Sequence, residues 1–314
     1  MSDEALRDAE VSFRSGGRTV RLGGYQRDLP RPSAAEVVTD RSLDSLPPSM
    51  DLRGFCTVVE DQKTLGSCTA NAAVGALEYH RKKHGVDPSD LSRLFVYYNT
   101  RRLKGTLQQD TGATIAESMA AVMAYGAPRA DLWPYDDQSR WREEPPQEVY
   151  ENAALNEVVQ YARVSPGIGV LGALAAEFPV CFGVFVPKLA YDIAGATGAM
   201  PELTEEEWNG EPAGGHAMLL VGYDLLRKLY LVRNSWGEGY AEGGYFTMPF
   251  SVMDRGGAPE GFWVLGQLEH QGGVTLRKAD QPSAADQVRA ELRGEIEGGL
   301  AGVRQGLRDR LTKK

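Results

Sequence analysis

The amino-acid sequence changes character near residue 175, and this change limits the folds open to the chain. Before it, three segments have the composition and glycine endings of helices: residues 69–85, 90–105 and 114–126. After it, short β-type runs are separated by Gly, Asp and Pro: residues 178–186, 216–224, 228–236, 243–250 and 261–268. Helices followed by strands predict an α+β protein: a helical N-terminal half packed on an antiparallel sheet or barrel, with any active-site cleft between them.

Composition narrows the possible partners. The net charge of −9 and the pI near 5.1 disfavour binding to nucleic acid, which needs a clustered positive face. No stretch is long and apolar enough to span a bilayer, so we expect no membrane partner. The first residues, MSDEALRDAEVSF, have no apolar core of a signal peptide, which predicts a cytoplasmic protein, with non-standard export left open.

The chain is expected to have three parts. Residues 1–45, the lead-in segment, end in a Pro/Ser/Asp-rich run and predict an extended stretch with little core of its own. Residues 46–272 form the main domain. In residues 273–314 the apolar side chains follow one helical stripe: Val288, Leu292, Ile296, Leu300, Val303, Leu307 and Leu311. We expect this tail helix to dock on its own domain or on a partner chain.

Cysteines are few. Cys56, Cys68 and Cys181 make an odd number that fits a reducing compartment, although a Cys56–Cys181 bridge stays open. Cys68 lies at the first turn of a predicted helix, where the helix dipole favours the thiolate that a nucleophile needs. The small residues before it, Gly66 and Ser67, leave room for a substrate backbone.

A base and its orienting group come from the second half of the chain. His216 opens one β-type run and Asn234 ends the next. Two strands joined by a short turn would bring these side chains together. An imidazole held by an amide can act as a general base, which is the Cys-His-Asn version of a catalytic triad.

Three segments resemble the active-site segments of papain-like cysteine peptidases in order, composition and spacing: EDQKTLGSCTANA, GGHAMLLVGYD and LVRNSWGEGYAEGGYF. The resemblance implies that Cys68 is the nucleophile, His216 the base and Asn234 its orienter. It also implies that Gln62 stabilises the oxyanion and that Trp236 shields the Asn234–His216 hydrogen bond from water.

The resemblance extends over roughly residues 46–270, without the lead-in segment or the tail. LPPSMDLRG is similar to the start of the mature domain, and the segment that begins at QDTGAT is similar to the wall that binds substrate. This similarity implies that Gly112 lies beside the substrate backbone. Gly215, just before the base, offers a binding position without a side chain.

Two departures from the family pattern matter. The family usually bridges a cysteine shortly before the nucleophile to one in the wall segment, but Leu65 and Gln109 stand at these positions. The joint loss favours an intracellular or bacterial-type branch. The lead-in segment is shorter than the family's helical propeptide, so it is either a short cleavable blocker or a segment retained on the folded body.

The expected activity is hydrolysis of peptide bonds in peptide or protein substrates through an acyl-enzyme, without metal or organic cofactor. His80 and His84 share a predicted helix, but the basic residues between them favour a solvated helix face over a metal site. Two alternatives remain: an acyl transferase such as a transglutaminase, and a binding module that keeps the fold without catalysis.

Overall fold

The helical half contains the three helices that the sequence predicts. The computed structural model describes residues 10–12, 19–31, 34–86, 89–135, 139–156, 160–209, 214–266 and 274–277. Its first helices are α1 (Cys68–Lys83), α2 (Arg93–Lys104), α3 (Ile115–Tyr125) and α4 (Gln147–Ala153). Gly105 and Gly126 end α2 and α3 at φ of 75° and 71°, a backbone region that side-chain-bearing residues avoid. Single 3₁₀ turns cover Leu43–Ser45, Arg53–Phe55, Arg140–Arg142 and Ala154–Asn156.

The second half is a mixed, open sheet. Its strands are β3 (Glu36–Thr39), β4 (Ser49–Asp51), β5 (Gln160–Val164), β6 (Val180–Phe185), β7 (Gly215–Asp224), β8 (Leu229–Arg233), β9 (Tyr245–Pro249), β10 (Gly257–Gly266) and β11 (Val274–Arg277). Along the sheet they follow the order β11-β3-β5-β10-β6-β7-β8-β9, and β4 pairs with β7. The strands predicted after residue 175 are all present.

The structure differs from the predicted antiparallel sheet or barrel in two respects. Strand β3 runs parallel to β5, and the described strands do not close into a barrel. Strand β3 belongs to the lead-in segment, and the long connection from β3 to β5 allows the two strands to run in the same direction. Shorter helices α5 (Ile168–Ala175), α6 (Lys188–Thr197), α7 (Glu205–Trp208) and α8 (Phe250–Gly256) accompany the strands. A small hairpin of β1 (Glu10–Ser12) and β2 (Thr19–Arg21) begins the described chain.

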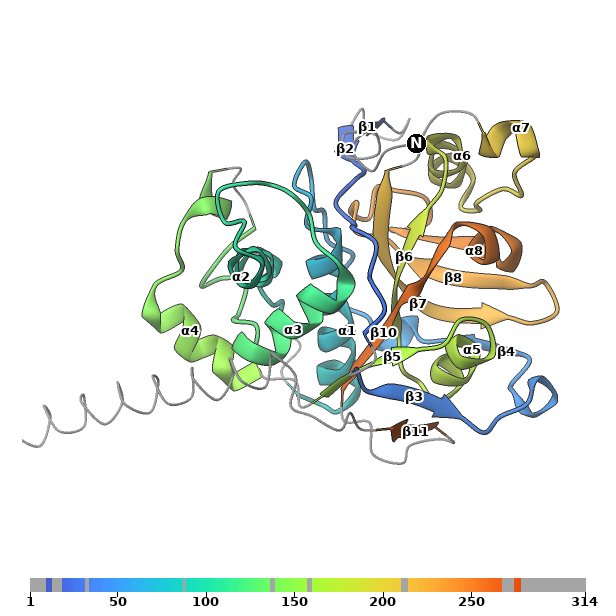
Figure 1. Cartoon of the computed structure of the whole chain (residues 1–314), viewed down its shortest axis with the longest axis horizontal. Helices are drawn as coiled ribbons and strands as arrows, with labels where there is room; N and C mark the ends of the chain where they lie inside the picture. The colour runs from blue at the N-terminus through green and yellow to red at the C-terminus, as the bar shows by residue number, and fades with distance from the viewer. Residues whose placement is uncertain are drawn as a thin grey trace, which may run out of the picture.

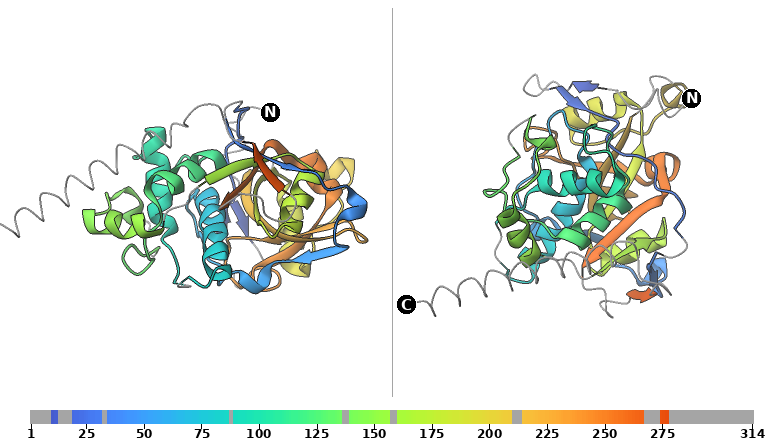
Figure 2. Two further views of the ribbon diagram at one scale, coloured as in Figure 1. Left: turned by 90° about the horizontal axis from the view of Figure 1, so that it is seen from below. Right: turned by 60° about the vertical axis from the view of Figure 1, so that its left-hand side comes forward.

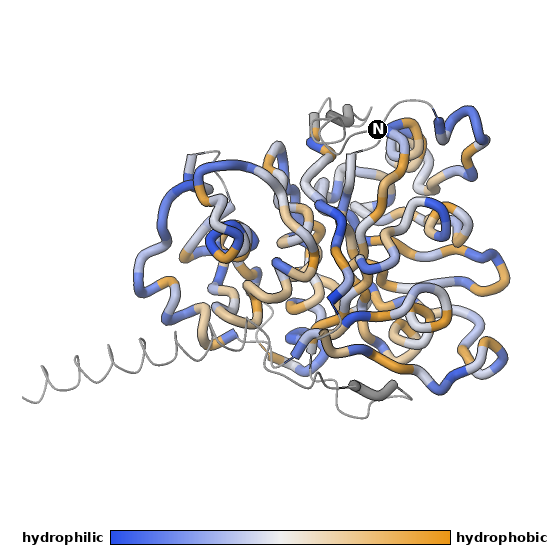
Figure 3. Tube along the Cα trace, in the orientation of Figure 1, coloured by the Kyte–Doolittle hydropathy of each residue, from blue (hydrophilic) through white to orange (hydrophobic). Residues whose placement is uncertain are grey.

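Helix α1 lies between the other helices and the sheet (Figure 1). Its alanine-rich sequence allows this position, because small side chains let packed neighbours approach closely on several sides. Ala70, Ala73 and Ala76 are completely buried. In Figure 3 the hydrophobic colour follows mainly the strands, whereas hydrophilic colour gathers on the outer loops.

The lead-in segment contributes more to the core than expected. Figures 1 and 2 show it running from β2 through the seam between the two halves to β3. Val20, Leu22, Tyr25 and Val37 are all at most 3% exposed, so the expectation of little core is wrong. The domain boundaries at residues 45 and 272 stay predictions, and the tail helix lies outside the described residues.

Other expectations concern cysteines, histidines and membranes. All three cysteines are buried and free, so Cys56 and Cys181 do not form the bridge that the sequence left open. His80 does not lie on a solvated face: its ring packs against Phe178 and Tyr79, and burial lowers its pKa to about 3. Within the described ranges, no helix has the length and apolarity to cross a membrane.

Candidate active site

The candidate nucleophile begins α1. Cys68 is the first residue of that helix and is completely buried. Backbone N–H groups of Ala217 and Thr69 point to its sulfur and favour the thiolate, but burial outweighs them and raises the pKa of the thiol to about 12. Because Ala217 directly follows His216, this contact brings the nucleophile to the start of β7.

His216 and Asn234 meet as predicted. The His216 Nε2 and Asn234 Oδ1 atoms are 2.8 Å apart, and Oδ1 also accepts the N–H of Ser235 at 2.8 Å. An oxygen acceptor at Nε2 requires the proton there, which leaves Nδ1 as the ring's acceptor. Nδ1 is buried without a hydrogen-bond partner among the described residues. It is therefore the nitrogen available to take the thiol proton.

Trp236 covers this pair. Its ring stacks on the His216 ring with centroids 4.7 Å apart and planes at 21°, and the residue is fully buried. Burial lowers the pKa of His216 to about 4, while the Asn234 hydrogen bond opposes that shift. Burial thus acts on both groups in the direction of their neutral forms.

Gln62 is held in a fixed orientation by a residue that the sequence analysis did not single out. The Ser235 hydroxyl donates to Gln62 Oε1 at 2.6 Å, and Gln62 Nε2 donates to the Leu65 carbonyl at 3.1 Å. A primary amide has two N–H donors, so one remains for a ligand. The sequence did contain a signal for this role of Ser235, because Ser235 directly follows the orienting Asn234 in the NSWG segment.

Ser67 supports the nucleophile loop from behind. Its hydroxyl lies 2.6 Å from the Tyr135 hydroxyl and accepts from Asn71 Nδ2 at 3.1 Å. Tyr135 in turn donates to the Gln62 carbonyl at 2.8 Å. The Ser67 hydroxyl is thus occupied by Tyr135 and Asn71. Gly66 beside it contacts Gly24 instead.

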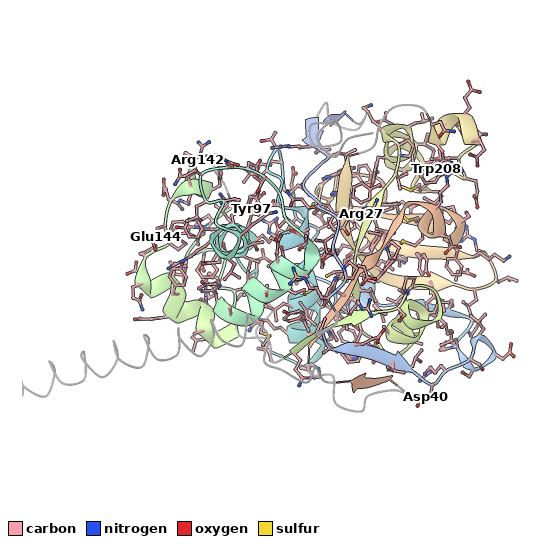
Figure 4. All side chains as sticks on the ribbon, in the orientation of Figure 1. Arg27, Asp40, Tyr97, Arg142, Glu144 and Trp208 are labelled. Atoms are coloured by element: carbon pink, nitrogen blue, oxygen red, sulfur yellow. The ribbon has the colours of Figure 1, made fainter. Side chains whose placement is uncertain are left out.

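Asp110 joins the nucleophile loop to the wall segment. Its carboxylate accepts the Gly66 N–H at 3.1 Å and the Tyr97 hydroxyl; Figure 4 labels Tyr97 in the helical half. The two joined segments are those that contain Leu65 and Gln109, where relatives carry a disulfide. A charge-assisted hydrogen bond therefore connects them here without sulfur chemistry.

Residues 21–28, the covering segment, lie between two walls, with Gly215 of the sheet on one side and Ala113 of the helical half on the other. The Gly215 carbonyl accepts the N–H groups of Gly23 at 3.0 Å and Tyr25 at 3.2 Å. On the opposite side Ala113 N–H donates to Gly24 at 3.0 Å, in a parallel bridge around Tyr25. The backbone of the covering segment therefore occupies hydrogen-bonding groups on both walls.

Glycines make this close approach possible. A Cβ on Gly24 would lie 2.8 Å from the backbone of Gly66, and one on Gly112 would lie 2.2 Å from the Gly24 oxygen. A Cβ on Gly215 would lie 2.4 Å from the Tyr25 oxygen. The predicted substrate-binding residues Gly66, Gly112 and Gly215 thus all contact the covering segment.

Tyr25 fills a side-chain pocket. A Cβ on Gly183 would lie 2.0 Å from its ring, and one on Gly261 would lie 2.5 Å from its hydroxyl. That hydroxyl donates to Asp28 at 3.2 Å. Asp28 accepts the N–H groups of Ile115 and Ala116 at 3.2 and 3.0 Å, at the positive end of α3.

In the part of the chain that the structure describes, no group of three or more His, Cys, Asp or Glu side chains is arranged to hold a metal ion. The arrangement described above supplies a thiol, a base, its orienter and oxyanion donors.

Comparison with known proteins identifies the family of this chain. Residues 46–257 match the model of the papain family cysteine proteases. An uncharacterized peptidase C1-like protein of Acanthamoeba polyphaga mimivirus is 34% identical over 69% of this chain and 74% of its own length. Cathepsin K of Gallus gallus is 29% identical over 71% of this chain and 64% of its own.

A solved structure extends the likeness to the fold. The crystal structure of xylellain, a cysteine protease from Xylella fastidiosa, superposes with a TM-score of 0.70 and 29% identity, covering 79% of this chain and 97% of that one. With more than half of the sequence matched, this chain belongs to the papain family of cysteine proteases, hydrolases of peptide bonds.

Proposed function

We propose that Cys68, His216, Asn234 and Gln62 carry out the peptide-bond hydrolysis of this protease, and that the lead-in segment blocks them. The supporting observation is that the covering segment takes up hydrogen-bonding groups on both walls beside a fully buried Cys68. A peptide substrate needs the same place, so block and catalysis exclude each other.

Catalysis begins when His216 Nδ1 takes the thiol proton and the Cys68 sulfur attacks the substrate carbonyl carbon. The new C–S bond pushes negative charge onto the carbonyl oxygen, where Gln62 Nε2 and the Cys68 N–H donate to it. The C–N bond then breaks as His216 gives its proton to the leaving amine. Water, deprotonated by His216, attacks the thioester and releases the acid and the thiol.

Gln62 offers a direct test of these roles. In a chain opened as described below, Gln62→Ala should slow turnover about 100-fold or more, since an oxyanion donor is typically worth about 2.7–4 kcal/mol. Cys68→Ala should abolish turnover. Ser235→Ala keeps the Gln62 amide but removes the hydroxyl that orients it, so turnover should fall by less than in Gln62→Ala. Near-normal turnover in Gln62→Ala would remove Gln62 from the mechanism.

The block is tested with a matched pair of glycine variants. Gly24→Val forces a side chain into the Gly66 backbone, whereas Gly54 is exposed with nothing within 4 Å of an added Cβ. An epoxide thiol trap should label the full-length wild type and Gly54→Val only slowly, and should rapidly give Gly24→Val a single adduct on Cys68. Adding His216→Ala should abolish that adduct. Equal labelling of wild type and Gly24→Val would contradict the block.

We also infer that the chain belongs to a bacterial-type branch that lacks the active-site disulfide. Leu65 and Gln109 in place of the cysteines support this, as does the likeness to xylellain of Xylella fastidiosa. The cytoplasmic location and the docking of the tail helix stay predictions.

A further inference from the structure

Asp110 of the wall segment and Arg21 of the covering segment form an ion pair. Arg21 Nη1 lies 2.6 Å from Asp110 Oδ2, with side chains 26% and 15% exposed. Arg21 belongs to the covering segment, only two residues before Gly23, whose N–H donates to the Gly215 carbonyl. The contact is thus made by chain that occupies the place of a substrate.

The acidic side of this pair is built by the protease body. Asp110 is held by the Gly66 N–H and the Tyr97 hydroxyl, neither of which belongs to the covering segment. When the covering segment leaves, the carboxylate stays in position and loses its cation. Among the ion pairs of the described residues, Arg21 provides the only cation on Asp110.

Other nearby cations are already engaged. Arg101 lies over the Tyr97 ring at 4.4 Å and donates to the Leu107 carbonyl at 2.7 Å and to the Trp141 carbonyl. Such a buried guanidinium with backbone partners cannot swing out without leaving those carbonyls unsatisfied. When Arg21 leaves, Asp110 Oδ2 therefore has capacity to accept a cation from outside the protease body.

Asp110 lies close to the nucleophile, because it accepts the N–H of Gly66, two residues before Cys68. Burial is the main cause of the raised pKa of the Cys68 thiol, and the charge of Asp110 raises it further. A cation on Asp110 would screen that charge and favour the thiolate. A substrate that supplies the cation would thereby lower the pKa of the Cys68 thiol that attacks it.

We propose that Asp110 is a recognition site for a basic side chain of the peptide substrate, and that Arg21 occupies this site in the blocked enzyme. The inference rests on the proposed block by the covering segment. It predicts that bound peptides place an arginine or lysine at the position that Arg21 vacates.

The test compares arginine with citrulline, which has nearly the same shape and no charge. Peptides that carry one or the other at successive positions are assayed with full-length Gly24→Val for kcat/KM. At one position arginine should exceed citrulline about tenfold, the size expected for a charge-assisted hydrogen bond. In Gly24→Val with Asp110→Asn the ratio should fall to about one. Each ratio is taken within one variant, so a general loss of folding or activity cancels.

Asp61→Asn provides the matched control. It also removes an acidic charge near the site, since both Asp61 and Asp110 act on the pKa of Tyr135, whereas the Asp61 carboxylate accepts the Lys63 N–H. It should keep the arginine preference. No arginine preference at any position, or a preference that survives Asp110→Asn, overturns the proposal.

Binding separates this proposal from the proposed function. In Gly24→Val with Cys68→Ala, the affinities of the arginine and citrulline peptides are measured by calorimetry without turnover. An affinity ratio of about ten that is lost on Asp110→Asn supports the recognition site even if the catalytic assignment fails. An affinity ratio of one refutes the recognition site even if the trap labels Cys68 and the enzyme hydrolyses peptides.

Discussion

The two ends of the described lead-in segment are attached to the protein in different ways. Strand β3 is built into the large sheet between β5 and β11, with Val37 only 3% exposed. The covering segment is held instead by hydrogen bonds on the two walls, by the buried side chains of Leu22 and Tyr25, and by the ion pair of Arg21. The first attachment is part of the fold, and the second is the kind that another peptide can replace. Under the proposed block, a permanent strand holds a removable segment in place over the site.

The strongest test of this difference is a buried charge in β3. Val37→Asp should lower the free energy of unfolding by about 3 kcal/mol or more, because an unpaired carboxylate would enter the core. Denaturant unfolding measures it. Val38→Asp, on the half-buried face of the same strand, should cost clearly less. Equal costs would mean that β3 is not part of the core.

The covering segment should respond in its own way. Tyr25→Ala removes a buried ring, so the labelling rate of Cys68 should rise about 100-fold while the unfolding midpoint of the body changes little. Tyr25→Phe keeps the ring and loses only the hydrogen bond to Asp28, and should raise labelling about fivefold. A large fall in unfolding midpoint for Tyr25→Ala would erase the distinction between the two attachments.

A pH dependence should distinguish the covering segment further. Burial raises the pKa of Asp28 to about 6 from an ordinary 3.8, although hydrogen bonds from Ala116 and Ile115 oppose it. Because the docked carboxyl holds its proton more tightly, docking is favoured at low pH and weakens as the pH rises from about 4 to about 6. Labelling of the full-length chain, relative to Gly24→Val at each pH, should increase roughly tenfold over this range. Asp28→Asn should remove the increase, and an unchanged increase there would exclude Asp28 as its source.

The smallest expected effect concerns the ion pair at the cleft. Arg21→Ala should raise the Cys68 labelling rate only about threefold, as expected for a partly exposed pair. Arg53→Ala, which breaks an exposed pair with Asp51, should leave labelling unchanged. If Arg21→Ala raised the labelling rate of Cys68 as much as Tyr25→Ala, the ion pair would hold the covering segment as strongly as the packing of the Tyr25 ring.

Much of the fold and site was predictable because their signals are local. Glycine endings located the helices, and alternation with turn residues located β6 to β10. The NSWG segment placed Asn234 and Trp236 against His216, as the structure shows. Ser235 escaped notice because its partner, Gln62, is distant in sequence.

The path of the lead-in segment was not predictable in the same way. Its contacts run between backbone atoms and glycines, which carry no side-chain pattern. The pair Gly23-Gly24 before Tyr25 was the available signal, since adjacent glycines suit close backbone approach. The parallel pairing of β3 with β5 joins segments far apart in sequence, and no local rule specifies such a partner.

The attachment of β3 sets how the block responds to dilution. The covering segment ends at Asp28 and β3 begins at Glu36, with Leu29, 71% exposed, in the short stretch between them. A ligand tethered so closely acts at an effective concentration on the order of millimolar, whatever the amount of protein present. Diluting the enzyme therefore does not release the covering segment, and a substrate competes with a tethered ligand whose effective concentration is constant. A cut near Leu29 would turn that tethered ligand into an ordinary dissociable inhibitor, and activity would then rise as the cut protein is diluted.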